Sequence, residues 1–92
     1  MSANILILKG TEAAAGTGSG TASNVGSARV VRCVNTNATT DYLVTLEESG
    51  GTDIGTFTLD GQQEAIIQKD PSDQLFAANA AVMAVGVAIN SN

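Results

Sequence analysis

Hydrophobic and polar residues alternate in several segments of the chain, and a period of two is typical of β-strands with one face in a core. The clearest alternation covers 42–48 and 53–59, which are separated by Ser-Gly-Gly-Thr at 49–52, a hairpin turn signal. The apolar face predicted for this hairpin carries Tyr42, Val44, Leu46, Phe57 and Leu59.

The same pattern predicts four further strands, at 5–8, 28–35, 63–69 and 80–89. Short turns join 42–48, 53–59 and 63–69 in succession, so we expect these three strands to form a meander. Short strands at regular spacing are typical of sandwiches and barrels. The sequence therefore predicts an all-β fold, a small antiparallel β-sandwich or barrel of about six strands.

The last predicted strand, 80–89, has β-branched residues at alternate positions, which favours a strand over a helix. Its two faces differ in size. One carries Met83, Val85, Val87 and Ile89, and the other carries mostly small residues that would let another backbone approach closely. An alanine-rich helix over 73–87 is the alternative.

The corner Asp70-Pro71-Ser72-Asp73 has the residues of a capped turn. A residue before proline is pushed out of the helical region, proline suits a first helical position, and aspartate can accept a bond from exposed N–H groups. We expect one short helical turn over 71–77, with Leu75 and Phe76 directed onto the core. A calcium site at Asp70 and Asp73 is the weaker interpretation, because the ligand spacing of a calcium loop is missing.

The N-terminal part combines an apolar run at 5–8 with a Gly-, Ala-, Ser- and Thr-rich stretch at 11–27. The Gly-x-Gly-x-Gly spacing at 16–20 is found in phosphate loops, but the Lys-Ser/Thr ending is missing, so a linker or extended arm held by another chain is favoured. We therefore divide the chain into an N-terminal strand and Gly-rich arm, 1–27, and a single β domain, 28–92.

Composition excludes several classes of function. The chain has 92 residues, a net charge of −5 and four basic residues, too few for a phosphate-binding cluster, so we expect no nucleic-acid partner. No apolar run is long enough to span a bilayer, and the first residues lack the basic start of a signal peptide, so we expect a protein made in the cytoplasm, without membrane association. The core is small and has no disulfide, which favours oligomerisation.

Candidate chemistry is sparse. The chain has no histidine, which excludes Ser–His and Cys–His pairs and makes a zinc site improbable, and Cys33 is expected to be an inert buried thiol. Glu47 and Glu48 are adjacent on a strand and point to opposite faces, and Lys69 is expected to form an exposed ion pair with Asp70. We therefore predict no enzyme activity and no catalytic, cofactor or metal site.

The candidate partner interface is Ile5, Leu6, Ile7, Leu8, Arg29 and Arg32. The apolar run at 5–8 suits a strand buried on both sides, or one that pairs with a neighbouring subunit. Arg29 and Arg32 are available for salt bridges to a neighbour, and ordinary solvated charges are the alternative.

Three segments together resemble a known class of protein: the Val-Thr-Leu…Gly-Thr hairpin at 44–56, Ile-Ile-Gln-Lys-Asp-Pro-Ser-Asp-Gln-Leu-Phe-Ala at 66–77, and Ala-Val-Met-Ala-Val-Gly-Val-Ala-Ile at 81–89. The chain resembles small β-rich virion structural proteins of tailed bacteriophages, particularly those of aquatic phages that infect cyanobacteria. The resemblance implies a virion component, made in the host cytoplasm, with no catalytic or cofactor site.

The leading hypothesis is a capsid decoration, or cement, protein that binds the major capsid protein as a homo-oligomer, with a trimer favoured. A tail, neck or fibre-associated virion protein is the first alternative. A carbohydrate- or host-surface-binding β module is the second, for which Tyr42 is the one candidate aromatic.

Overall fold

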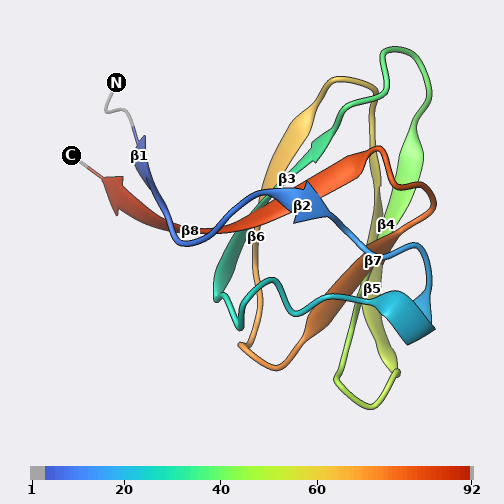
Figure 1. Ribbon diagram of the computed structural model, residues 1–92, viewed down its shortest axis with the longest axis horizontal. Coiled ribbons are helices and arrows are strands. Elements are labelled where there is room, and N and C mark those ends of the chain that lie inside the picture. Colours follow the sequence, from blue (N-terminus) through green and yellow to red (C-terminus); the bar gives the residue numbers. More distant parts are fainter. Residues whose placement is uncertain (1–3, 92) are drawn as a thin grey trace.

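The computed structural model describes residues 4–91 and has an all-β fold of two antiparallel sheets (Figure 1). Its elements are β1 (Asn4–Leu8), β2 (Ala13–Ala14), the 3-10 turn η1 (Ser19–Thr21), β3 (Val30–Asn35), β4 (Tyr42–Glu47), β5 (Asp53–Leu59), β6 (Glu64–Gln68), β7 (Gln74–Ala77) and β8 (Val82–Ser91). The predicted all-β sandwich is confirmed. The six expected strands are present, and β2 and β7 add to them.

The larger sheet is organised around β8, whose ten residues pair with three other strands. The strand order is β1-β8-β3-β6, and β2 also pairs with β8. Residues 82–86 of β8 lie against β3, whereas residues 87–91 lie against β1, with Leu6 opposite Ile89. The helix considered for 73–87 is therefore wrong. β8 is a strand that pairs with β3 along one edge and with β1 and β2 along the other.

The smaller sheet has the order β5-β4-β7. The β4–β5 hairpin is confirmed, and its turn is closed by the Glu48 N–H, which donates to the Thr52 carbonyl at 2.8 Å. The predicted meander is wrong, because β6 pairs with β3 in the other sheet. The chain crosses between the sheets after Leu59, where the Asn35 side-chain amide donates to the Leu59 carbonyl at 2.9 Å.

The core lies between the two sheets and is built from small and branched side chains. Its buried members are Ala15, Val31, Cys33, Val44, Leu59, Leu75, Ala77, Val82 and Ala84, with Tyr42, Leu46 and Phe57 packed against them from partly buried positions. The faces predicted for β4 and β5 are therefore confirmed on the apolar side. Removal of this apolar surface from water is the main stabilising contribution to the fold.

The corner at 70–77 differs from the prediction. Pro71 and Ser72 form a turn, closed by the Asp73 N–H, which donates to the Asp70 carbonyl at 3.0 Å. The following residues form β7 rather than a helical turn, and they pair with β4. Leu75 is fully buried but Phe76 is only half-buried, because neighbouring residues of a strand point to opposite faces.

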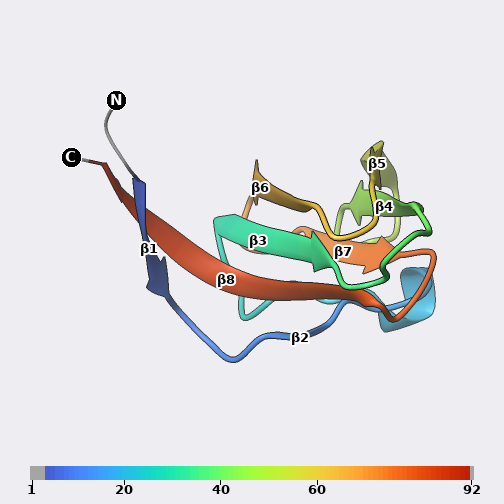
Figure 2. The same cartoon turned by 90° about the horizontal axis from the view of Figure 1, so that it is seen from above.

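The predicted N-terminal arm is largely built into the sandwich. Residues 13–14 pair with β8, Ala15 is 4% exposed in the core, and Gly16 and Ser23 bridge to β7. Gly16 is required there, because a Cβ at this position would lie 2.0 Å from the Thr21 carbonyl oxygen. The Gly-rich segment is thus held by its own chain, and β1 projects from the body together with the end of β8 (Figure 2).

Candidate interaction surface

β1 and residues 87–91 of β8 form a two-stranded ribbon that extends away from the two packed sheets (Figures 1 and 2). We call this pair of segments the terminal ribbon. Four of its large apolar side chains are exposed, Ile5 by 48%, Ile7 by 44%, Leu8 by 69% and Ile89 by 41%, whereas Val87 is buried. Leu6, the remaining member of the predicted apolar run, is half-buried.

The exposed aliphatic residues occupy both faces of the terminal ribbon, with Ile5 and Ile7 on one face and Leu8 and Ile89 on the other. A two-stranded ribbon is also marginally stable in water by itself. The ribbon has backbone pairing within itself, and no strand of residues 4–91 covers its exposed side chains. Its chemistry is that of a surface that becomes buried against a partner.

One edge of the ribbon is open for strand addition. The Gly86 carbonyl faces β1 and accepts the Lys9 N–H at 2.9 Å. Backbone groups of successive residues in an antiparallel strand point to alternate edges, so those of Ile89 point to the side of β3. β3 pairs with β8 only as far as Gly86, and within residues 4–91 no other strand pairs with β8 on that side.

A groove of about 620 Å³ lies beside this open edge, between β8 and the segment 25–30. Its wall is formed by Lys9, Val25, Gly26, Ser27, Ala28, Arg29, Val30, Val87, Ala88 and Ile89. Gly86 allows the segment to approach β8, because a Cβ there would lie 2.9 Å from the Ala28 Cβ. Most of the residues that form the groove wall are apolar, and the cationic side chains of Lys9 and Arg29 lie at its border.

The groove wall includes an unusual stretch of backbone. Val25, Gly26 and Ser27 have φ values of 54°, 67° and 59°. Positive φ is rare for a β-branched residue such as Val25 and carries a conformational cost. The stretch is held in place by side chains, since Ser23 Oγ accepts the Val25 N–H at 3.0 Å and Asn24 Oδ1 accepts the Ser27 N–H at 3.2 Å.

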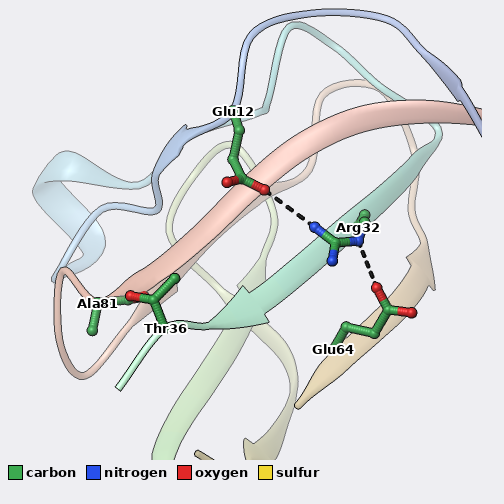
Figure 3. A network of polar contacts seen from close by, with 5 residues as sticks. All are labelled: Glu12, Arg32, Thr36, Glu64 and Ala81. Atoms are coloured by element: carbon green, nitrogen blue, oxygen red, sulfur yellow. Dashed lines mark hydrogen bonds and ion pairs between the residues drawn. The ribbon is translucent and has the colours of Figure 1, made fainter. Parts of the chain in front are cut away.

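The two arginines of the predicted interface lie in different surroundings. Arg29 is exposed at the groove, whereas Arg32 forms ion pairs with Glu12 and Glu64 of its own chain (Figure 3). The Arg32–Glu12 contact is 3.2 Å long and spans β8. Arg32 therefore fastens the segment before β2 to the larger sheet. Further along β3, the residue after its end, Thr36, is joined to the segment before β8, since its Oγ1 donates to the Ala81 carbonyl at 2.6 Å.

A buried carboxylate is the main polar feature that the sequence did not reveal. Glu47 is 0% exposed, although the alternation of β4 places it on the face opposite the predicted apolar residues. Gln74 Nε2 donates to its Oε1 at 2.7 Å, and the Ser19 hydroxyl donates to both carboxylate oxygens. These three hydrogen bonds hold segments of the same chain together, which assigns Glu47 a structural role.

Lys69 and Cys33 are also buried. The expected exposed ion pair of Lys69 with Asp70 is wrong: Lys69 is 6% exposed, and its Nζ donates to the carbonyl oxygens of Asp70 and Pro71 at 3.2 and 3.4 Å. Burial lowers the pKa of this amine, against the opposing effect of Asp73 and Asp70. Cys33 is 0% exposed, as predicted, and burial raises the pKa of its thiol to about 11.

Two further observations concern ligands and membranes. Within residues 4–91, the acidic and cysteine side chains form no group of three or more that could hold a metal ion. Over the same residues, no helix has the length and apolar character needed to cross a bilayer.

Comparison with known proteins gave no relative: no family model matches the chain, and neither a curated protein nor a solved structure matches it significantly.

Proposed function

We propose that this chain is a non-enzymatic virion structural protein of a tailed bacteriophage, and that it acts as a capsid decoration protein bound to the major capsid protein. The observation that carries the proposal is the terminal ribbon, with its exposed Ile5, Ile7, Leu8 and Ile89. The buried polar side chains of Asn35, Glu47 and Lys69, by contrast, form hydrogen bonds that hold the fold.

The terminal ribbon suits binding to a shell of identical subunits. The outer edge of β1, which within residues 4–91 pairs with β8 alone, can extend a sheet of the partner, and the aliphatic side chains of the ribbon would lose their remaining contact with water. Burying the exposed part of one such side chain stabilises a complex by roughly 1 kcal/mol. A homo-oligomer, of which a trimer is the form we favour, would present several ribbons at once and gain affinity through multivalency.

A tail, neck or fibre-associated location is the alternative that the same ribbon supports. The two locations differ in copy number per virion, which is high for a protein that covers the shell and low for one on the tail axis. The carbohydrate-binding hypothesis is less well supported, because its candidate aromatic, Tyr42, is half-buried and packs against the core.

The proposal is tested with capsids purified without the protein and mixed with wild type or with two double variants. Ile5→Thr with Ile7→Thr makes the ribbon polar and keeps β-branched residues in β1. Leu43→Thr with Ile66→Thr is the matched control, because these residues are 47% and 39% exposed and lie outside the ribbon.

We expect the control to saturate the capsids like wild type and the ribbon variant to bind at least about tenfold more weakly in co-sedimentation. Equal binding of the two variants would contradict the role of the ribbon. Absence of wild-type binding to capsids, together with a few copies per virion by quantitative mass spectrometry, would move the protein to the tail.

A further inference from the structure

The acidic side chains without a role in the fold are gathered around β5. Glu12 and Glu64 pair with Arg32, Glu47 is buried, Asp41 accepts the Gly61 N–H, and Asp70 and Asp73 lie beside the Lys69 amine. Glu48, Asp53 and Asp60 remain, and their carboxylates have no hydrogen-bond or ion-pair partner within residues 4–91. Asp53 begins β5, Asp60 follows it, and Glu48 lies across the hairpin turn.

β5 is also an open edge of the smaller sheet. It pairs with β4 on one side only, and within the described chain no strand pairs with its other side. Its first four residues are exposed, including Ile54 at 52%. An edge strand of this length, with backbone groups free for pairing, is a template for another strand.

The cations have the complementary distribution. Arg32 is paired and Lys69 is buried, so the basic side chains left without a partner within residues 4–91 are Lys9 and Arg29. Both border the groove beside the open edge of β8. The open edge at β5 is therefore acidic, and the groove beside the open end of β8 is basic.

The two edges lie at opposite ends of the molecule. The terminal ribbon and β5 are separated along the long axis of the molecule in both views of the fold (Figures 1 and 2). The molecule extends over 38 Å along this axis. They cannot meet within one chain, but they can meet between two copies.

We infer that copies of this chain join head to tail, with β5 of one copy added as a strand to the open edge of β8 at 87–91 of the next. The groove that carries Arg29 and Lys9 then lies beside the incoming edge that carries Asp53 and Asp60. The occupant of the groove is thus a second copy. This inference rests on one part of the proposed function, the homo-oligomer, and names the contact that joins its copies. It does not depend on capsid binding.

Two different surfaces take part in this contact, so it is heterologous and forms a ring where the rotation closes and a filament where it does not. Backbone bonds along the added strand supply affinity, and the opposite charges of the two surfaces favour this pairing over the pairing of like surfaces. Ion pairs at a partly exposed interface are screened by salt, so self-association weakens as ionic strength rises.

The test uses two charge-reversed variants of the full chain. The groove variant carries Lys9→Glu and Arg29→Glu, and the edge variant carries Asp53→Lys and Asp60→Lys. In each variant alone, like charges face each other across every contact. In an equimolar mixture, the negative groove meets the positive edge and the positive groove meets the negative edge, so both kinds of contact become favourable.

We expect wild type to self-associate by light scattering at low salt, each variant to self-associate about tenfold more weakly, and the mixture to recover association near that of wild type. Circular dichroism shows whether each variant keeps the β fold. A monomeric wild type at its highest soluble concentration, unchanged association of either variant, or folded variants that fail to recover in the mixture would each overturn the inference.

This experiment needs no capsid, and both variants keep Ile5 and Ile7. Failure of the charge swap therefore leaves capsid binding by the ribbon untouched. Failure of capsid binding likewise leaves the head-to-tail contact untouched.

Discussion

The hydroxyl of Ser19 donates a hydrogen bond to the buried carboxylate of Glu47, at 3.1 Å from Oε1 and 3.0 Å from Oε2. Ser19 begins η1 in the Gly-rich segment, and Glu47 ends β4. Gln74 of β7 donates to the same carboxylate at 2.7 Å. One side chain therefore joins three segments that are distant in sequence and holds the Gly-rich segment on the smaller sheet.

We expect Glu47→Ala to lower the free energy of unfolding by about 2 to 3 kcal/mol, because it leaves the Gln74 amide without its acceptor and opens space in a buried site. Glu48→Ala is the control: this exposed neighbour should change stability by less than about 0.5 kcal/mol. Urea unfolding followed by circular dichroism measures both. Similar effects of the two substitutions would contradict a structural role for Glu47.

Gly16→Ala should destabilise the protein by about 1 to 3 kcal/mol, since its Cβ would lie 2.0 Å from the Thr21 carbonyl oxygen and backbone would have to move. Gly20→Ala adds the same methyl group where nothing lies within 4 Å. We expect that control to be neutral or slightly stabilising. Thermal unfolding of the two variants measures the difference. Equal midpoint temperatures would mean that the segment around Gly16 is flexible rather than packed.

The pH dependence of stability should contain a contribution from Cys33. Its thiol has an ordinary pKa of 9.0, and burial raises the pKa in the fold to about 11. Between these values the unfolded chain loses the proton while the folded chain keeps it, so stability is fully present below pH 9 and falls as the pH rises toward 11. The slope is at most about 1.4 kcal/mol per pH unit.

Cys33→Ala removes this contribution and provides the comparison. The difference in unfolding free energy between wild type and variant should be constant up to about pH 8 and shrink above pH 9. A difference that stays constant to pH 11 would mean that the thiol titrates equally in both states.

Removal of residues 1–8 should leave a cooperatively folding sandwich, because β1 contacts only the projecting end of β8 and contributes no core residue. Removal of 1–20 should cost far more, since it also removes β2, Ala15 of the core and the Ser19 hydroxyl. Denaturant titration of the two shortened chains and wild type gives the comparison. Equal stability of the shortened chains would place residues 9–20 outside the fold.

The sequence predicted the strands whose alternation is regular. β4, β5 and β8 were identified from apolar residues at every second position, because burial of one face of a strand produces that pattern in the sequence. The turn between β4 and β5 was identified from Gly50 and Gly51. β7 was missed because Pro71 and Asp73 are also helix-start residues. Pairing with β4, a tertiary contact, decided the conformation.

The candidate surface was predicted in part. The apolar run at 5–8 was correctly predicted to be a strand, but not one buried on both sides, and its partner within the chain, the end of β8, could not be inferred from either segment alone. The burial of Glu47 depends on the Gly-rich segment folding over β4, and no local pattern records that contact. Arg29 and Arg32 looked alike in sequence and differ only because Glu12 and Glu64 reach Arg32.

The central position of β8 has a consequence for how the chain folds. β8 is the last described strand, yet β1 and β2 find their only strand partner in it, so neither can pair until β8 has been synthesised. A fold dominated by contacts between distant parts of the sequence folds slowly for its length. During synthesis the emerging chain therefore carries an unpaired apolar β1, and a ribosome-bound intermediate is the form most exposed to aggregation.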